Sequence, residues 1–348
     1  MLSILKIITK NLYERIVENS NKNNVLHSIM IEIQSICNWR CKHCYIPNYT
    51  KQIKTEKILD ILKELREMGT FEVVLTGGEI FYRNDTIDII RIARNMGFNV
   101  TLMSNISLLD EYKIKELKNL FISTISCTVF SLDEEIHDFI TNVKGSLKKI
   151  LENIYLINEY DIPLEIKMPV LKYNQNCIDK LHEFCIKNNL KFKPDLSITT
   201  KLDGDTEPQN LMLENNELER LISKVDNIVG YRKFKENKDN QLVCERMNCS
   251  LSINSDGDIN PCNLLPIPIG NIYKDRLKDI WKNSELLCKL SKIKYGDLEN
   301  CKKCDVKDYC VRCPGTEYMN SGRLYGCSNL SKKIATVRYN VDKKEDFV

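Results

Sequence analysis

Three cysteines near the start of the chain, Cys37, Cys41 and Cys44, form a C-x3-C-x2-C motif on a predicted loop. Thiolates at this spacing can wrap one compact metal centre. If that centre is a [4Fe–4S] cluster, three ligands leave one iron without a protein ligand and therefore open to chemistry. The alternative is a partial zinc site, for which His43 is the nearest candidate fourth ligand.

A second group of cysteines lies in the C-terminal third of the chain. In order, these residues are Cys244, Cys249, Cys262, Cys301, Cys304, Cys310, Cys313 and Cys327. Asp256-Gly257 predicts a hairpin turn that carries Cys262 on its second strand. Eight thiolates suffice for two four-ligand centres, either zinc sites or iron–sulfur clusters, and the three-cysteine motif upstream favours clusters.

The chain contains 15 cysteines in 348 residues. A chain of this size needs no disulfides and no export signal is apparent, so we expect metal ligands and free thiols in a cytoplasmic protein. Lys plus Arg number 51 against 48 Asp plus Glu, a net charge of +3, which argues against a nucleic-acid binder. No apolar run approaches the ~18 residues of a membrane span. The remaining cysteines, expected to be small buried apolar side chains, are Cys127, Cys177, Cys185 and Cys288.

Six β-rich runs alternate with stretches of helical periodicity over the first two thirds of the chain. The runs are residues 27–34, 71–76, 98–104, 121–130, 162–171 and 190–198. Repeated βα units predict a parallel sheet, either doubly wound or curled into part of a (β/α) barrel. Both arrangements place their chemistry at the carboxyl ends of the strands, where the first cysteine motif falls.

Composition divides the chain into three predicted parts. Residues 1–26 are apolar at helical spacing and predict an N-terminal helical segment. Residues 27–236 hold the βα units, and residues 237–348 form a small Cys-rich domain. The boundary is placed near residue 236, because a charged stretch there reads as a linker.

The first cysteine motif, ICNWRCKHCY, resembles that of the radical S-adenosylmethionine (SAM) enzymes. The resemblance implies a partial (β/α)6 TIM-like barrel and a [4Fe–4S] cluster whose open iron is chelated by SAM. One electron then cleaves SAM to a 5′-deoxyadenosyl radical. A one-electron reductant such as flavodoxin or ferredoxin is implied as a partner.

Segments at the ends of the later strands extend this resemblance to SAM-contacting positions. These positions are Gly77, Gly78, Glu79, Ser104, Asn105, Thr128 and Lys167. In the family, the carboxylate at Glu79 meets the SAM ammonium, the Ser-Asn pair meets the ribose, and the last two positions point into the barrel mouth. Lys167 is also the one candidate catalytic side chain, with an exposed edge lysine as the alternative. His137 is interpreted as a packing residue and is assigned no role. The family's usual Pro and Gly after the GGE and Ser-Asn segments are Ile80 and Ile106 here.

The C-terminal cysteines resemble the SPASM extension of radical SAM enzymes, which holds two auxiliary [4Fe–4S] clusters. In that extension the ligands interleave, giving a first set of Cys244, Cys249, Cys262 and Cys313 and a second set of Cys301, Cys304, Cys310 and Cys327. The family often has three residues between the last two cysteines of the central run, whereas two stand here.

The strands after residue 126 resemble those of radical SAM enzymes that modify ribosomally made peptides. The expected activity is therefore oxidative modification of a precursor peptide, forming a thioether or a carbon–carbon crosslink. The alternatives are a sulfatase-maturase-like or tetrapyrrole-modifying enzyme, a peptide epimerase, or a non-catalytic zinc or iron–sulfur scaffold. The segment before the first strand is too short for a winged peptide-recognition domain, so a separate small recognition protein is expected.

Overall fold

The computed structural model describes residues 14–231, 233, 238–327 and 329–345. Of the predicted N-terminal helical segment, residues 14–22 are helical and residues 1–13 lie outside the described part. The predicted domain boundary near residue 236 also lies outside it. Within the described ranges, no helix is both long enough and apolar enough to cross a membrane.

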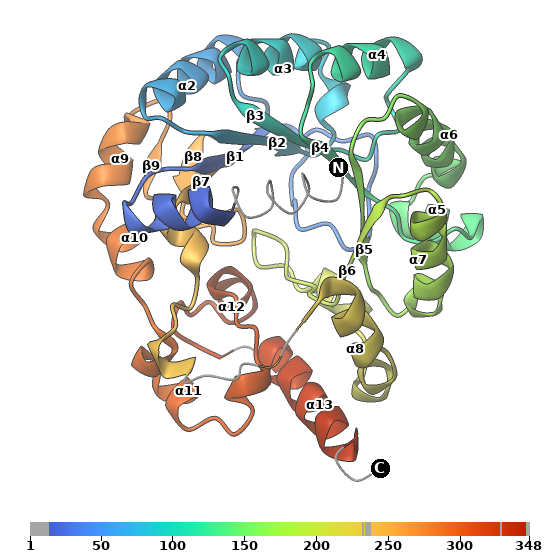
Figure 1. Ribbon diagram of the computed structural model, residues 1–348, viewed down its shortest axis with the longest axis vertical. Helices are drawn as coiled ribbons and strands as arrows, with labels where there is room; N and C mark the ends of the chain where they lie inside the picture. Colours follow the sequence, from blue (N-terminus) through green and yellow to red (C-terminus); the bar gives the residue numbers. More distant parts are fainter. Residues whose placement is uncertain (1–13, 232, 234–237, 328, 346–348) are drawn as a thin grey trace.

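Six parallel strands form an open, curved sheet in chain order, as the βα repeats predict (Figure 1). They are β1 (Ser28–Gln34), β2 (Glu72–Gly77), β3 (Asn99–Met103), β4 (Thr124–Thr128), β5 (Leu164–Pro169) and β6 (Lys191–Asp195). The helices outside the sheet are α2 (Thr55–Glu67), α3 (Thr86–Asn95), α4 (Glu111–Asn119), α5 (Glu134–Thr141), α6 (Ser146–Glu159), α7 (Ile178–Lys187) and α8 (Asn215–Val229). The sheet does not close into a full barrel.

The main core lies between this sheet and its outer helices. In β1, Ile29, Ile31 and Ile33 are fully buried beneath the helices, because alternate residues of a strand face opposite sides. The alternate positions of β1, Met30 and Glu32, face the other side and line interior cavities. The concave face of the sheet is therefore free for polar, functional side chains.

The C-terminal part continues the same sheet instead of forming a detached module. Strand β7 (Ser250–Ile253) pairs in parallel with β1, and β8 (Asp258–Asn260) and β9 (Gly270–Asn271) add antiparallel strands. The predicted hairpin is present, with Gly257 at a φ of +87° in its turn. Cys262 lies just after β8 and not on the strand, because the hairpin ladder ends at residue 260.

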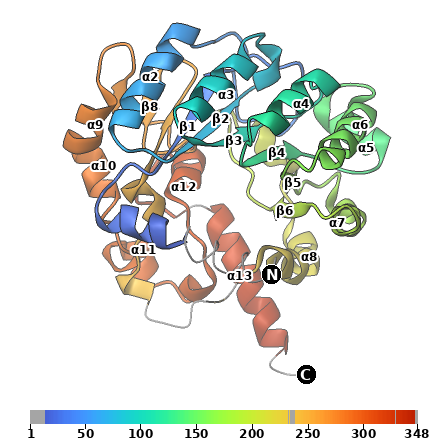
Figure 2. The same cartoon turned by 45° about the horizontal axis from the view of Figure 1, so that its top comes forward.

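Helices from the C-terminal part bridge the two edges of the open sheet (Figures 1 and 2). They are α9 (Leu277–Asn283), α10 (Glu285–Leu290), α11 (Glu299–Lys302), α12 (Pro314–Ser321) and α13 (Asn329–Glu345). The guanidinium of Arg338 on α13 pairs with both carboxylate oxygens of Asp226 on α8, at 2.7 and 2.8 Å. The Thr200 hydroxyl, beyond β6, donates to the Met319 carbonyl of α12 at 2.9 Å.

Short 3-10 helices connect these elements. They are η1 (Ile80–Tyr82), η2 (Gln175–Cys177), η3 (Glu207–Leu211), η4 (Lys238–Asn240), η5 (Glu245–Asn248), η6 (Tyr295–Asp297) and η7 (Lys307–Tyr309).

Candidate functional site

A cavity of about 320 Å³, here called the strand-end cavity, lies at the carboxyl ends of the parallel strands. Its wall contains all but one of the residues that the sequence predicts for the first centre and for SAM. These residues are Cys37, Cys41, Cys44, Gly77, Gly78, Ser104, Asn105, Thr128 and Lys167. The wall also contains Asn263, which follows Cys262 in the C-terminal part. One cavity thus joins the barrel and the Cys-rich region.

The loop that carries the first three cysteines is fixed to the end of helix α5. The Arg40 backbone N–H donates to the Thr141 carbonyl at 3.2 Å, and the Lys42 N–H donates to the Ile140 carbonyl at 2.9 Å. These carbonyls are available because the last carbonyls of a helix lack intrahelical partners. Trp39, between two cysteines, is buried and anchors the loop in the core.

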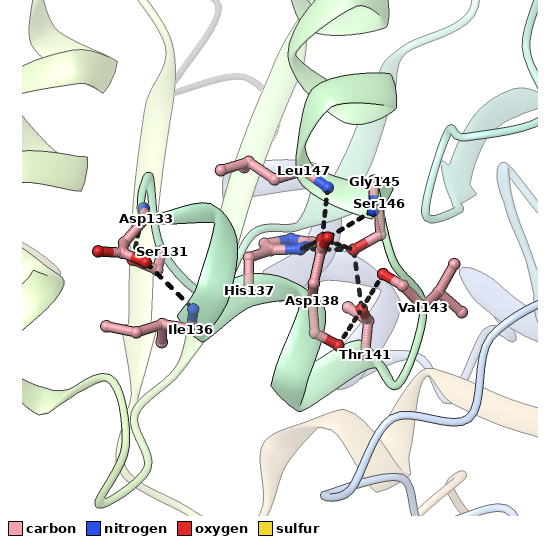
Figure 3. Close-up of polar contacts among 10 residues, drawn as sticks. All are labelled: Ser131, Asp133, Ile136, His137, Asp138, Thr141, Val143, Gly145, Ser146 and Leu147. Atoms are coloured by element: carbon pink, nitrogen blue, oxygen red, sulfur yellow. Dashed lines mark hydrogen bonds and ion pairs between the residues drawn. The ribbon is translucent and has the colours of Figure 1, made fainter.

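Helix α5 is in turn held to α6 by hydrogen bonds to the Asp138 carboxylate (Figure 3). Oδ1 accepts from the Ser146 hydroxyl at 2.7 Å and from the Leu147 N–H at 3.1 Å, and Oδ2 accepts from the Gly145 N–H. The Gly145 and Leu147 N–H groups are backbone donors at the start of α6, so Asp138 caps a neighbouring helix from α5. The hydrogen bonds lower the pKa of Asp138 despite its partial burial, which by itself raises the pKa. The α5–α6 junction therefore supports the cysteine loop.

His137 lies in the same junction as a packing residue, which confirms its interpretation. It is fully buried, its ring packs edge-on against Trp39 with 5.9 Å between centroids, and its Nδ1 lies 2.9 Å from the Ser146 hydroxyl. Burial lowers its pKa to about 4, so the ring is neutral at physiological pH.

The three thiols of the loop are buried together, and burial is the main cause of their raised pKa values. The pKa of Cys37 rises to about 11, and those of Cys41 and Cys44 also lie above the usual value. Mutual repulsion between the thiolates adds to the shift for Cys37 and Cys41. A metal centre supplies the positive charge that makes such grouped thiolates stable, so the donor set fits a metal centre.

Gly77 and Gly78 allow β2 to approach the cysteine loop closely. A Cβ at Gly77 would lie 2.1 Å from the Gln34 carbonyl oxygen, and one at Gly78 would lie 2.3 Å from that of Ser35. The Gly78 N–H donates to the Gln34 carbonyl at 2.9 Å. Both glycines are thus needed for close contact between two segments of the chain, the end of β2 and the start of the cysteine loop, in addition to any contact with SAM.

Glu79 is the exception among the predicted SAM contacts, because its side chain lies behind the cavity wall. The fully buried carboxylate accepts hydrogen bonds from the Phe81 N–H at 3.0 Å, the Ser104 hydroxyl at 2.7 Å and the Asn105 N–H at 2.6 Å. The sequence predicts a carboxylate that faces the cavity, and the geometry differs because the end of β3 supplies its donors. Burial raises the pKa of Glu79 to about 7, although these hydrogen bonds oppose the shift.

Asn105, which donates its N–H to Glu79, also forms hydrogen bonds with the cysteine loop. Its Nδ2 donates to the Asn38 side-chain oxygen at 2.9 Å, and the Asn38 amide donates to the Ser107 hydroxyl at 2.9 Å. The GGE segment, the Ser-Asn segment and the cysteine loop therefore form one hydrogen-bonded unit.

Thr128 and Lys167 are register partners on β4 and β5, and both line the strand-end cavity. This placement agrees with the prediction that both side chains point toward the mouth of the barrel. Burial lowers the pKa of Lys167. Beside it, Glu165 pairs with Lys193 at 2.7 Å.

The second set of C-terminal cysteines converges on one small cavity of about 20 Å³. Cys301, Cys304, Cys310 and Cys327 all line it. Lys238, only 1% exposed, lies beside this set and donates to the Cys310 and Lys307 carbonyls. Its Nζ also lies 4.2 Å from the Tyr295 ring centroid. A buried cation therefore accompanies these four thiols.

In the first C-terminal set, thiolates raise the pKa values of their neighbours, which indicates that these thiols lie near one another. Burial raises the pKa of Cys262 to about 12, and the thiolates of Cys313 and Cys244 add to the shift. Burial is also the main cause of the raised pKa values of Cys244 and Cys249, and the thiolates of Cys313 and Cys244, respectively, add to these shifts. The interaction of Cys313 with Cys262 and Cys244 agrees with the predicted interleaved arrangement, in which Cys313 joins this set although it is only three residues from Cys310 in sequence.

Within the described ranges, no three His, Cys, Asp or Glu side chains converge as they would on a single metal ion. A zinc ion draws its ligands to one point about 2.3 Å from each sulfur. The cysteines of a four-iron cluster each bind a different iron and stand farther apart.

Of the four remaining cysteines, Cys127 and Cys185 are fully buried, as predicted. Cys177 is half-buried at the end of η2. Cys288 is exposed, which differs from the expectation, because it lies on the outer side of the short helix α10.

Sequence reasoning missed Glu32 and Lys238, both buried beside the candidate centres. The alternation of β1 could have drawn attention to Glu32, because it is a carboxylate within the apolar run IMIEI. The position of Lys238 could not be predicted from nearby residues, since its neighbours in space are distant in sequence.

Two family models match the chain. The Radical SAM superfamily matches residues 31–185, and SPASM, an iron–sulfur cluster-binding domain, matches residues 244–305. Together the matched segments span more than half of the chain.

Curated relatives and solved structures show low identity over most of the chain. The AdoMet-dependent heme synthase of Methanosarcina barkeri is 22% identical over 86% of this chain and 94% of that protein. The sporulation killing factor maturation protein SkfB of Bacillus subtilis is 22% identical over 75% of this chain and 66% of that protein. Streptococcus suis SuiB, bound to precursor peptide SuiA, has a TM-score of 0.70 at 17% identity and covers 91% of this chain and 79% of its own. This last likeness shows a shared fold.

Proposed function

Because this chain belongs to the radical SAM superfamily and carries a SPASM iron–sulfur cluster-binding domain, we propose that it oxidatively modifies a ribosomally made peptide. The observation that carries the proposal is the strand-end cavity, where three cysteines, the glycine turn and a residue of the C-terminal part share one wall. An enzyme that couples SAM cleavage to substrate oxidation needs this proximity.

The chain's own residues would hold the cofactors. Cys37, Cys41 and Cys44 would bind the [4Fe–4S] cluster that, when SAM is bound to its open iron, supplies a 5′-deoxyadenosyl radical. Each C-terminal set of four would bind one auxiliary cluster. The hydrogen-bonded unit of Glu79, Asn105 and the cysteine loop would keep the SAM side of the cavity fixed.

The expected product is a peptide lighter by two hydrogens for each modification. Four protein ligands for each auxiliary centre leave no iron open for a substrate thiol, so these centres suit one-electron acceptance. Loss of a hydrogen atom followed by loss of an electron and a proton leaves the substrate oxidised by two electrons. Formation of a thioether or of a carbon–carbon crosslink is a two-electron oxidation of this kind, with loss of two hydrogens.

A peptide substrate is supported by the names of SkfB, a killing-factor maturation protein, and of SuiB, whose structure holds a precursor peptide. The second candidate is modification of a tetrapyrrole, because the heme synthase of Methanosarcina barkeri aligns over 94% of its length. Partners under the first proposal are the precursor peptide, a flavodoxin or ferredoxin, and a separate small recognition protein.

Anaerobic incubation with SAM, reductant and the product of a short peptide gene beside this one tests the proposal, with mass spectrometry as the readout. We expect a peptide lighter by two hydrogens, together with 5′-deoxyadenosine. A parallel incubation with a carboxylated tetrapyrrole should leave that compound unchanged. Conversion of the tetrapyrrole and not of the peptide would replace the first proposal by the second. A peptide whose mass is unchanged in ordinary water, and which gains one deuterium at an α-carbon in heavy water, would instead indicate an epimerase.

A further inference from the structure

A second, smaller cavity of about 30 Å³ lies where β1 meets the C-terminal hairpin. Three side chains in its wall are more than nine-tenths buried, with exposures of 8% for Glu32, 4% for Ser252 and 4% for Asn260. Within the described part of the chain, Glu32 Oε1, Ser252 Oγ and Asn260 Oδ1 have no hydrogen-bond partner. We call this cavity the acceptor subsite, because its wall contains a carboxylate, an amide and a hydroxyl side chain, each with an oxygen that lacks a partner among the described residues.

The acceptor subsite adjoins the strand-end cavity. Met30, Tyr45, Thr76 and Asn263 belong to the walls of both. Met30 and Glu32 lie two residues apart on β1 and therefore face the same side of the sheet. The two cavities therefore lie side by side on one face of the sheet, so a group attached to a substrate in the larger cavity has the acceptor subsite next to it.

The chemistry of the subsite selects a hydrogen-bond donor that carries positive charge. The Ser255 N–H donates to Glu32 Oε2 at 3.0 Å, so one carboxylate oxygen is held in place and the other is open. Water could make three hydrogen bonds there, but it would leave the charge of a buried carboxylate uncompensated. A primary ammonium makes the same three hydrogen bonds, supplies the missing charge and is about the size of one water molecule.

Two features of the protein around Glu32 favour an ammonium group over water in the acceptor subsite. Burial raises the pKa of Glu32 to about 7, which shows that the site lacks a compensating cation. Asp256 adds negative potential, although its carboxylate already pairs with Lys51 at 2.9 Å.

We propose that the acceptor subsite receives a primary ammonium group of the substrate and so positions the substrate in the strand-end cavity. The inference rests on the proposed function in that the substrate must occupy this cavity. It makes Glu32, Ser252 and Asn260 determinants of specificity, contributed by both parts of the chain.

The first test uses methylammonium as the probe and the full chain with clusters and SAM bound. At pH 8, methylammonium should raise the thermal midpoint of wild type in a saturable manner, relative to tetramethylammonium at equal ionic strength. Glu32→Gln should abolish the shift. Glu165→Gln is the matched control, because Glu165 is equally buried on the sheet interior but already pairs with Lys193, and it should keep the shift.

Ser252→Ala is a second variant that removes only a hydroxyl, in case Glu32→Gln does not fold. It should weaken the apparent methylammonium affinity about tenfold, as expected for loss of a hydrogen bond to a charged group. No saturable shift in wild type, or an equal shift in Glu32→Gln, would overturn the inference and leave ordered water as the occupant.

A second test uses the modified peptide and separates this inference from the proposed function. Acetylating the peptide's amines should raise its KM about tenfold for wild type and have no such effect on Glu32→Gln. A peptide that is modified equally well with and without its amines contradicts the subsite alone. A chain that cleaves SAM and binds methylammonium but modifies no peptide contradicts the proposed function alone.

Discussion

Asp138→Asn should destabilise the α5–α6 junction and, through it, the loop that carries the first three cysteines. The carboxylate accepts from the Ser146 hydroxyl and from the Gly145 and Leu147 N–H groups (Figure 3). An asparagine presents one N–H2 group to these donors, so at least one hydrogen bond to a charged group is lost. Such a bond contributes about 1.5–3 kcal/mol, and we expect the free energy of unfolding to fall by about 2 kcal/mol at pH 8.

The assay is denaturant unfolding of variant and wild type, together with the rate of iron loss to a chelator. Asp133→Asn is the matched control on the same helix, because Asp133 caps α5 from an exposed position and asparagine caps equally well. We expect no measurable change for Asp133→Asn and faster iron loss for Asp138→Asn. Equal unfolding free energies for the two variants would refute the reasoning, as would unchanged iron retention.

The pH dependence of this effect has a defined sign. The folded-state pKa of Asp138 lies below its ordinary value, so the residue contributes stability above pH ~4. That contribution is lost as the pH falls through the folded-state pKa. The difference between wild type and Asp138→Asn should therefore be largest at neutral pH and shrink in acid.

Further predictions concern the centres and Glu79. Replacing Cys37, Cys41 and Cys44 by Ala should remove about a third of the iron and all SAM cleavage, measured by iron analysis and 5′-deoxyadenosine. Ala at both Cys301 and Cys304 should preserve 5′-deoxyadenosine and abolish the oxidised peptide in mass spectra. Because burial raises the folded pKa of Glu79 from 4.5 to about 7, its ionisation should lower the unfolding free energy between these pH values by roughly 3 kcal/mol. Glu79→Gln should remove that slope in unfolding curves, and a slope that stays the same in the variant would show that another group is responsible.

Local patterns predict the elements of this fold well. The alternation in residues 27–34 and the helical spacing of Ile58, Ile61, Leu62 and Leu65 each reflect one buried face, and the structure buries those faces. The cysteine spacings likewise indicated two groups of centres, because ligands of one centre must lie close together. The helix and strand patterns, and the spacing of the first three cysteines, depend on neighbours within a few residues of each other.

Features that depend on contacts between residues far apart in the sequence could not be predicted from it. Nothing in the composition near residue 250 indicates that β7 pairs in parallel with β1, more than 200 residues earlier. The orientation of the Glu79 side chain could not be predicted either, because one of the three donors to its carboxylate is the backbone N–H of Asn105, 26 residues away. A motif identifies which residues gather at a strand end, but the neighbouring strand decides which of them face the cavity.

Strand β1 connects the two kinds of centre in this chain. At its start, the His27 and Ser28 N–H groups donate to the Cys249 carbonyl at 2.8 and 3.1 Å, and Cys249 is a predicted ligand of the first auxiliary centre. At its end, two residues separate Gln34 from Cys37 of the first motif. A single seven-residue strand, paired on both sides, therefore sets the spacing between these ligands. Since Glu32 lies on that strand, the acceptor subsite has a fixed position relative to both centres, as a site that positions substrate between them requires.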